Sequence, residues 1–383
     1  MYRIYYAEKD TTLYEKYPDQ NTGIDQILEL TKVASGSKSN GIIQAKTFNS
    51  RILIDFGTEI TALSSSIVDN EIPEFESTNR TSASAFLNLH ATDASDLLQK
   101  YTIHAYPVSE SWANGSGIAN DTPYSKIGSS WYNSHGDNST NPEPWKTGSA
   151  QSITDGIGAT IVNGGGTYIT ASGSNQEFIN QSPDLRIDIT NIVKGWVDGT
   201  YANNGIIIKR DSTDEKSGEV LGSIKYFGRE SHTIFVPRLE VCWDDLNNAD
   251  GNTNVISANT YVPYFKNIKP EYRTSEITRF YVGVRPEFPT KSYQTSSFYI
   301  TSEKLPVSSS YEIIDSVTND VIIKDTDNWA DSTTKISNNS NEGSYFNLRM
   351  DSFMPERYYK IKLTCRRTND TQTFDNFYFK VVN

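Results

Sequence analysis

The sequence predicts an all-β protein built from two domains. Short runs in which apolar and polar residues alternate recur along the chain, as in residues 185–189 (Leu-Arg-Ile-Asp-Ile), and this period of two is typical of strands with one buried face. The 23 tyrosines, 16 phenylalanines and 6 tryptophans also favour strands over helices. A length of 383 residues suits two or three domains better than one.

The same alternation predicts further strands with one buried face. It is clear at 52–56 (Ile-Leu-Ile-Asp-Phe) and at 239–243 (Leu-Glu-Val-Cys-Trp), and it returns near the C-terminus at 359–365 and 377–381. Asn-Gly and Asp-Gly pairs separate such runs, and these pairs tolerate the positive φ angles of tight turns. Many short strands joined by such turns are the pattern of β-sandwiches.

One short helix is expected between Thr190 and Gly199. Thr190 suits the start of a helix as its cap, and Gly199 suits the residue that closes it. Ile192 and Trp196 are four residues apart, which places them on one apolar stripe. We expect this stripe to pack against the first sandwich.

A polar segment divides the chain. Residues 244–254 are rich in Asp and Asn and have no hydrophobic period, which indicates a linker. We therefore expect a first domain at 1–243, a linker at 244–262 and a second domain at 263–383. The several alternating strands of the last span suit a small immunoglobulin-like β-sandwich.

Motifs in the first domain resemble those of the DNRLRE-type domain. Residues 185–197 (LRIDITNIVKGWV) are similar to its "vDVTdlVqgWv", and residues 17–23 (YPDQNTG) are similar to its "yPdtNyG" start. Residues 106–112 (YPVSESW) and 237–241 (PRLEV) match two further motifs, in family order. The resemblance implies a jelly-roll-like β-sandwich over residues 2–243. The chain departs from the family in its long insert around 109–147.

The motifs of common enzymes and metal sites are missing from the sequence. It contains no HExxH pattern, no Gly-x-Ser-x-Gly elbow and no phosphate-binding glycine loop. We therefore expect no enzyme, with no catalytic residue, no cofactor and no metal site. Cys242 and Cys365 are expected to be buried reduced thiols. Oxygen ligands for Ca²⁺ occur at Asp137-Asn138 and at 325–328, but neither place fits an EF-hand loop.

Charge and hydropathy exclude two classes of partner. The chain has 35 basic and 47 acidic residues, a net charge of -12, and no basic stripe, so we expect no binding to nucleic acid. No apolar run approaches the length of a membrane span, so we expect no membrane partner. Residues 1–6 lead directly into strand-like sequence without a signal-peptide pattern, so we expect synthesis and folding in a cytoplasm.

Aromatic residues in the long insert allow two interpretations. Trp112, Trp131 and Trp145 lie there beside Asn and Asp, and exposed rings of this kind would form a sugar-binding platform. The interpretation we favour is that they pin the loop or fill a subunit contact. Tyr261, Tyr264 and Tyr272, which follow the linker, are expected to contribute to subunit contacts as well.

The make-up of the whole chain resembles structural proteins of tailed marine phages, including cyanophages. The resemblance implies a non-enzymatic virion structural protein in the neck, tail or head surface. Its expected partners are other virion structural proteins and further copies of itself, and its expected location is the virion. The alternative is a carbohydrate-binding or adhesion module that recognises cell-surface glycans, and such binding is also compatible with a place in the particle.

Overall fold

The chain forms two compact units. The computed structural model describes residues 1–39, 42–75, 82–137, 140–146, 164–248, 255–289, 303–326, 328–339, 342–368 and 370–383. The N-terminal unit comprises Tyr5–Phe75 and Ser84–Glu240, and the C-terminal unit comprises Met1–Ile4, Glu76–Ala83 and Val241–Asn383. The division after Glu240 lies close to the boundary expected after residue 243. The first four residues, however, are grouped with the C-terminal unit.

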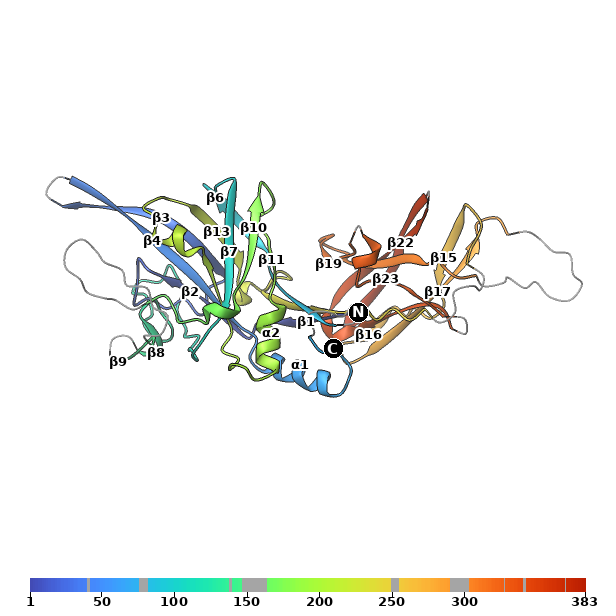
Figure 1. The fold of residues 1–383 in the computed structure, drawn as a ribbon, viewed down its shortest axis with the longest axis horizontal. Helices are drawn as coiled ribbons and strands as arrows, with labels where there is room; N and C mark the ends of the chain where they lie inside the picture. The colour runs from blue at the N-terminus through green and yellow to red at the C-terminus, as the bar shows by residue number, and fades with distance from the viewer. Residues whose placement is uncertain are drawn as a thin grey trace, which may run out of the picture. The chain divides into compact units, whose positions relative to one another are not determined.

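Strands dominate the N-terminal unit, and the predicted all-β class is confirmed (Figure 1). A four-stranded sheet has the order β1-β14-β5-β11, and an eight-stranded sheet has the order β10-β7-β12-β4-β3-β13-β6, with β2 also paired to β4. Many neighbours are far apart in the sequence, as in jelly rolls and other Greek-key sandwiches. The strands are β1 (Tyr2–Tyr6), β2 (Lys9–Tyr14), β3 (Ile27–Ser39), β4 (Ile42–Asp55), β5 (Ser84–Leu89), β6 (Ala91–Ser95), β7 (Lys100–Pro107), β10 (Ser174–Ile179), β11 (Leu185–Asp188), β12 (Ile206–Arg210), β13 (Gly222–Phe227) and β14 (Arg238–Cys242), and a separate ribbon is formed by β8 (Asn133–Asp137) and β9 (Asn141–Pro144).

Strand β4 lies at the centre of this unit. Ile52, Leu53 and Ile54 are all fully buried, so the prediction of a single buried face at 52–56 is wrong. Leu53 belongs to an apolar cluster together with Ile207 of the neighbouring strand β12. Consecutive apolar residues are typical of strands that are covered on both faces. A further layer therefore covers the sheet here.

The helices confirm one prediction and add elements that were not expected. Helix α2 (Thr190–Val197) buries Ile192 and Trp196, and Gly199 follows it with a φ of 70°. Thr190 does not cap the helix, because its hydroxyl accepts from the backbone N–H of Ala85 in β5. Two further helices in the described part of the chain were missed, and four 3-10 turns are found there as well: α1 (Thr58–Val68), α3 (Ser212–Lys216), η1 (Thr170–Ser172), η2 (Arg229–Ser231), η3 (Trp329–Asp331) and η4 (Met350–Ser352).

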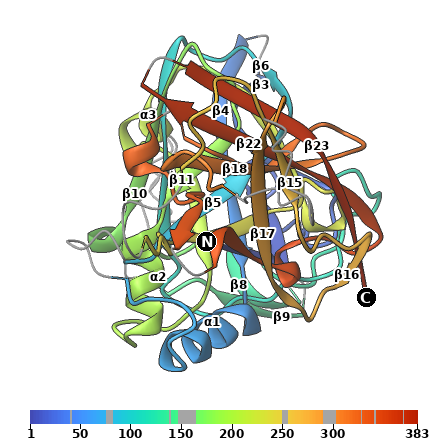
Figure 2. The same ribbon diagram turned by 90° about the vertical axis from the view of Figure 1, so that its right-hand side faces the viewer.

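The C-terminal unit has the strand order of an immunoglobulin domain. One sheet runs β15-β17-β21-β20 and the other β16-β23-β22-β18-β19, which correspond to strands A-B-E-D and G-F-C with their edge strands. The predicted immunoglobulin-like sandwich is therefore confirmed, and Figure 2 shows its long β22–β23 hairpin. The strands are β15 (Tyr261–Phe265), β16 (Glu271–Arg273), β17 (Ile277–Pro286), β18 (Ser308–Asp315), β19 (Val321–Ile323), β20 (Ser337–Asn339), β21 (Gly343–Arg349), β22 (Arg357–Arg367) and β23 (Asp370–Val382).

Aromatic rings join the two sheets of this unit. The Phe346 ring on β21 stacks on Tyr311 of β18, with centroids 4.2 Å apart, and Phe280 on β17 meets Phe379 of β23 at 5.9 Å. Near the start of β22, the Tyr359 hydroxyl donates to the Met354 carbonyl at 2.9 Å. This contact is the tyrosine corner typical of immunoglobulin-like sandwiches.

The described part of the expected linker is attached to the C-terminal unit. Lys335 Nζ donates to Asp244 at 2.6 Å, and the Asn247 backbone N–H donates to Ser337 Oγ at 3.0 Å. Strand β15 also lies partly within the 244–262 span. Polar composition did not reveal this attachment, because side chains such as Asp244 make hydrogen bonds in place of apolar contacts.

The structure also bears on the two cysteines and on the question of membrane-spanning helices. Cys242 and Cys365 are buried reduced thiols, as expected. Among the helices that the structure describes, none is both long enough and apolar enough to cross a membrane.

Candidate functional site

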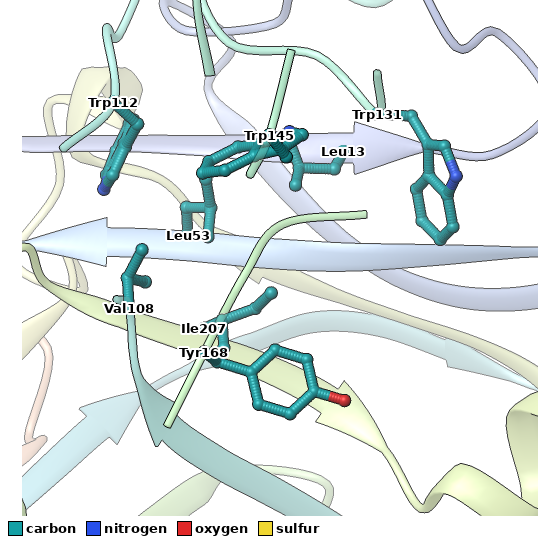
Figure 3. Packing of buried hydrophobic residues seen from close by; sticks show 8 residues of the cluster. All are labelled: Leu13, Leu53, Val108, Trp112, Trp131, Trp145, Tyr168 and Ile207. Atoms are coloured by element: carbon teal, nitrogen blue, oxygen red, sulfur yellow. The ribbon is translucent and has the colours of Figure 1, made fainter. Parts of the chain in front are cut away.

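The three tryptophans of the insert are core residues. Trp112, Trp131 and Trp145 are each at most 3% exposed and pack with Leu53 and Ile207 on the outer side of β4 and β12 (Figure 3). The sugar-platform interpretation is therefore wrong for these rings. They fix the insert to the sheet, as the favoured interpretation held. The insert is therefore the layer that covers the outer side of β4 and β12.

The same burial corrects the prediction about subunit contacts. Tyr261 and Tyr272 are 3% and 1% exposed, because their rings pack on Phe374 and Phe280 inside the C-terminal unit. These tyrosines and the three tryptophans are thus committed to the interior of their own units. Exposed aromatic residues at other positions remain available for contacts with partners.

The side chain of Asn21 anchors the insert through hydrogen bonds. Its amide nitrogen donates to the carbonyls of Asn114 and Ser129 at 2.7 and 2.8 Å. Its amide oxygen accepts from the N–H groups of Gly23 and Gly117 at 3.1 and 2.9 Å. All four hydrogen-bonding positions of this fully buried side chain are therefore used, which gives the YPDQNTG motif a structural role.

A buried network of charged side chains connects β4 to α3. Glu215 accepts from Arg51 at two points and forms an ion pair with Lys209 at 2.9 Å. Burial raises the pKa of Glu215, but the charges of Arg51 and Lys209 outweigh it and hold this pKa below its ordinary value. Arg51 also donates to the Gly165 carbonyl at 2.6 Å. Since each of these groups is buried and paired, the network is structural.

The described carboxylates of both places suggested for Ca²⁺ already have protein partners. Asp325 accepts from Ser332, Thr334 and Arg366, so its carboxylate already has protein partners. Asp137 lies in the N-terminal unit, where it accepts from Thr140. Residues 138 and 327 lie outside the described residues, and the structure groups no three metal-ligating side chains within the part it describes.

The candidate functional site is a surface groove over strands β2, β3 and β13, which we call the β3 groove. It consists of two hollows of about 390 and 310 Å³ that share Tyr14, Tyr17, Glu29 and Lys225. Both volumes fall within the range of ligand sites, roughly 300–1,000 Å³. The remaining lining residues are Lys16, Thr31, Val33, Phe48, Asn49, Asp93, Ser95 and Ser223 in the larger hollow, and Gln20, Asp25, Ile27, Ala119 and Asn120 in the smaller one.

Strand alternation builds the floor of this groove. Leu28 and Leu30 are buried on one face of β3, and the intervening Ile27, Glu29 and Thr31 line the groove on the other. The sequence contained this signal, because residues 27–31 alternate like the other strands. Its functional meaning was missed because the groove also needs side chains from distant strands.

Polar and aromatic groups meet at the centre of the β3 groove. Lys225 Nζ lies 3.2 Å from Glu29 Oε1. Burial and then the Glu29 carboxylate raise the pKa of the Tyr14 phenol well above its ordinary value, so this hydroxyl stays protonated. Tyr17 is 46% exposed, and the Lys16 ammonium lies 5.2 Å from its ring centroid. The groove therefore offers donors, acceptors and an exposed ring together.

The rim of the smaller hollow is fixed by hydrogen bonds. Gln20 Nε2 donates to the Ala119 carbonyl at 2.7 Å. Asp25 accepts from the N–H groups of Ala119 and Ile27, at 2.9 and 3.2 Å. These bonds hold the start of the insert against β3, so the wall of the groove is preformed.

Comparisons with known proteins do not assign the chain to a family. No protein-family model and no curated protein sequence matches it. Among solved structures, a β-glucuronidase from Parabacteroides merdae, crystallised with glycerol in its active site, is 9% identical with a TM-score of 0.16. That match covers 95% of this chain and 35% of the glucuronidase, so the chain spans about a third of that protein's length. A score this low carries no argument about fold or function.

Proposed function

We propose that this chain is a non-enzymatic structural protein of a tailed phage particle, located in the neck, tail or head surface. The observation that carries the proposal is the packing of the insert as an extra layer, through Trp112, Trp131, Trp145 and Asn21. A loop that is used for catalysis is commonly mobile, whereas the insert packs as a fixed layer of the N-terminal unit. The DNRLRE-type motifs are the second support.

In this proposal the chain works in multiple copies, through contacts with itself and with other virion proteins. Exposed rings on β22 and β23 support such contacts, because Tyr358 and Tyr378 are each 53% exposed and lie on adjacent strands. Tyrosine is enriched in protein interfaces. We propose these two exposed tyrosines as contact residues in place of the tyrosines and tryptophans that the sequence had suggested and that are buried.

Quantitative mass spectrometry of purified particles tests this proposal. The chain's peptides should be retained through gradient purification, at a copy number comparable to that of known structural proteins of the same particle. A non-structural phage protein expressed at the same time serves as the control and should be depleted. Recovery of the chain only from the soluble lysate would refute the virion role.

A second candidate function is glycan binding as an adhesion module. The β3 groove favours it, because Tyr17 is exposed beside the Glu29–Lys225 pair. Pockets that combine an apolar surface with a few polar groups are typical of small-ligand sites. A particle protein with such a groove would act in both roles.

A further inference from the structure

We infer that the β3 groove binds a neutral oligosaccharide, with Tyr17 stacking on a sugar ring and the Glu29–Lys225 pair binding its hydroxyl groups. This inference deepens the second candidate function by naming its site and its ligand class. It does not depend on the virion role.

The charge of the groove favours a neutral ligand. Its two hollows are lined by two ammonium groups, Lys16 and Lys225, and by three carboxylates, Asp25, Glu29 and Asp93. Nucleic acids and sulfated glycans carry repeated negative charges and need a surplus of Lys and Arg. The nearly balanced groove lacks that surplus among its lining residues, so a polyanion would be repelled as much as it is attracted.

The chemistry of the lining matches sugar hydroxyls. A hydroxyl both donates and accepts, so one pyranose edge satisfies the Glu29 carboxylate and the Lys225 ammonium, 3.2 Å apart, at the same time. Ser95 adds an exposed hydroxyl group in the larger hollow, and Asn120 adds an exposed amide group in the smaller one. The flat apolar face of a sugar ring is complementary to the exposed Tyr17 ring.

The length of the groove favours more than one sugar unit. The two hollows share Tyr14, Tyr17, Glu29 and Lys225, so a chain bound at this centre extends into both. The hydrogen bonds of Gln20 and Asp25 fix one wall in advance. Preorganisation of this kind lowers the entropic cost of binding.

The test uses the full chain on an array of neutral, uronic-acid and sulfated oligosaccharides, followed by titration calorimetry with the best neutral ligand. Tyr17→Ala removes the exposed ring, and Glu29→Gln removes the carboxylate with little change of shape. Phe288→Ala is the control for the first variant, because Phe288 is also an exposed aromatic residue and does not line the groove. Glu312→Gln is the control for the second, because Glu312 pairs with Lys362 at the same 3.2 Å distance.

We expect each groove variant to weaken neutral-glycan binding by at least about tenfold, while both controls bind like the unmodified chain. All four variants should keep the thermal unfolding midpoint within a few degrees, since these side chains are at least partly exposed. Failure to bind any neutral glycan, a preference for sulfated glycans, or undiminished binding by both groove variants would overturn the inference. Retention of Tyr17→Ala in purified particles separates this outcome from the virion proposal.

Discussion

Arg51 on β4 and Glu215 on α3 are 164 positions apart and form a two-point ion pair, with Nε–Oε1 and Nη2–Oε2 distances of 3.0 and 2.8 Å. Lys209 contacts the same carboxylate at 2.9 Å. Two cations thus share one buried anion. The pair connects a short helix, whose own five residues supply little stability, to the central strand of the sheet.

Glu215→Gln should lower the free energy of unfolding by about 3–5 kcal/mol, because it leaves two buried cations without their counter-charge. Chemical denaturation at pH 7 measures this effect. Glu230→Gln removes half of a more exposed pair with Arg229 and should cost at most about 1 kcal/mol. Equal effects of the two variants would contradict a structural role for the buried network.

The same pair predicts acid sensitivity. The folded-state pKa of Glu215 lies below its ordinary value of 4.5, so its stabilising contribution is present above pH 4.5 and is lost as the pH falls further. Unfolding curves of the unmodified chain should therefore shift more steeply below pH 4.5 than those of Glu215→Gln. Parallel curves in this range would contradict the lowered pKa.

Asp10 should have the opposite effect. Burial raises its pKa from 3.8 to about 7, despite the bond from the Arg229 N–H. Its stabilising contribution is therefore complete below pH 3.8 and is lost as the pH rises through 7. At about 1.4 kcal/mol per tenfold change in proton affinity, the upper limit of this loss is about 4 kcal/mol.

Asp10→Asn keeps an acceptor for that N–H and removes the charge. It should gain stability over the unmodified chain as the pH rises from 4 to 8, as measured by denaturation across this range. Asp188→Asn is the matched control, because its exposed carboxylate also accepts one backbone N–H. The prediction fails if the advantage of Asp10→Asn does not grow with pH.

A variant of Asn21 should show how much the two hydrogen bonds that its amide nitrogen donates contribute to holding the insert. Asn21→Asp keeps both accepted bonds but turns a carboxylate toward the carbonyls of Asn114 and Ser129. Each lost bond to a buried group costs about 1–3 kcal/mol, so we expect a loss of at least about 2 kcal/mol and faster amide exchange in residues 112–134. Exposed Asn376→Ala is the control. Unchanged exchange in the insert would show that the tryptophans hold it alone.

Trp196 tests the apolar stripe of α2. Its ring is 7% exposed, and its indole nitrogen has no hydrogen-bond partner among the residues that the structure describes. Trp196→Ala should therefore cost about 3–5 kcal/mol, whereas Trp196→Phe, which keeps most of the apolar contact, should cost much less. Denaturation midpoints compare the two. Equal costs would mean that the indole nitrogen matters more than the packing.

Local patterns predicted much of the fold. Alternation at 185–189 marked β11, where Leu185 and Ile187 are buried and Arg186 and Asp188 are exposed, and the stripe at Ile192 marked α2. Helix α1 was missed because three consecutive serines at 64–66 weaken its apolar stripe, although Ile60 and Leu63 are buried on it.

Longer-range features could not be predicted from one sequence. From sequence alone, a tryptophan side chain in a polar, glycine-rich insert can be either exposed to solvent or buried. These tryptophans are buried because Leu53 and Ile207 present apolar side chains on the outer side of the sheet. The β3 groove needs Glu29 and Lys225, which are distant in the sequence and lie opposite each other only through the pairing of β13 with β3.

The most direct test of the virion role is an electron cryo-microscopy reconstruction of the particles whose genome encodes this chain. We predict repeated density in the neck, tail or head surface that is fitted by the N-terminal sandwich with its tryptophan-filled layer and by the immunoglobulin-like unit. A complete reconstruction in which other proteins account for all the density, with no peptide of this chain in the same particles, would contradict it.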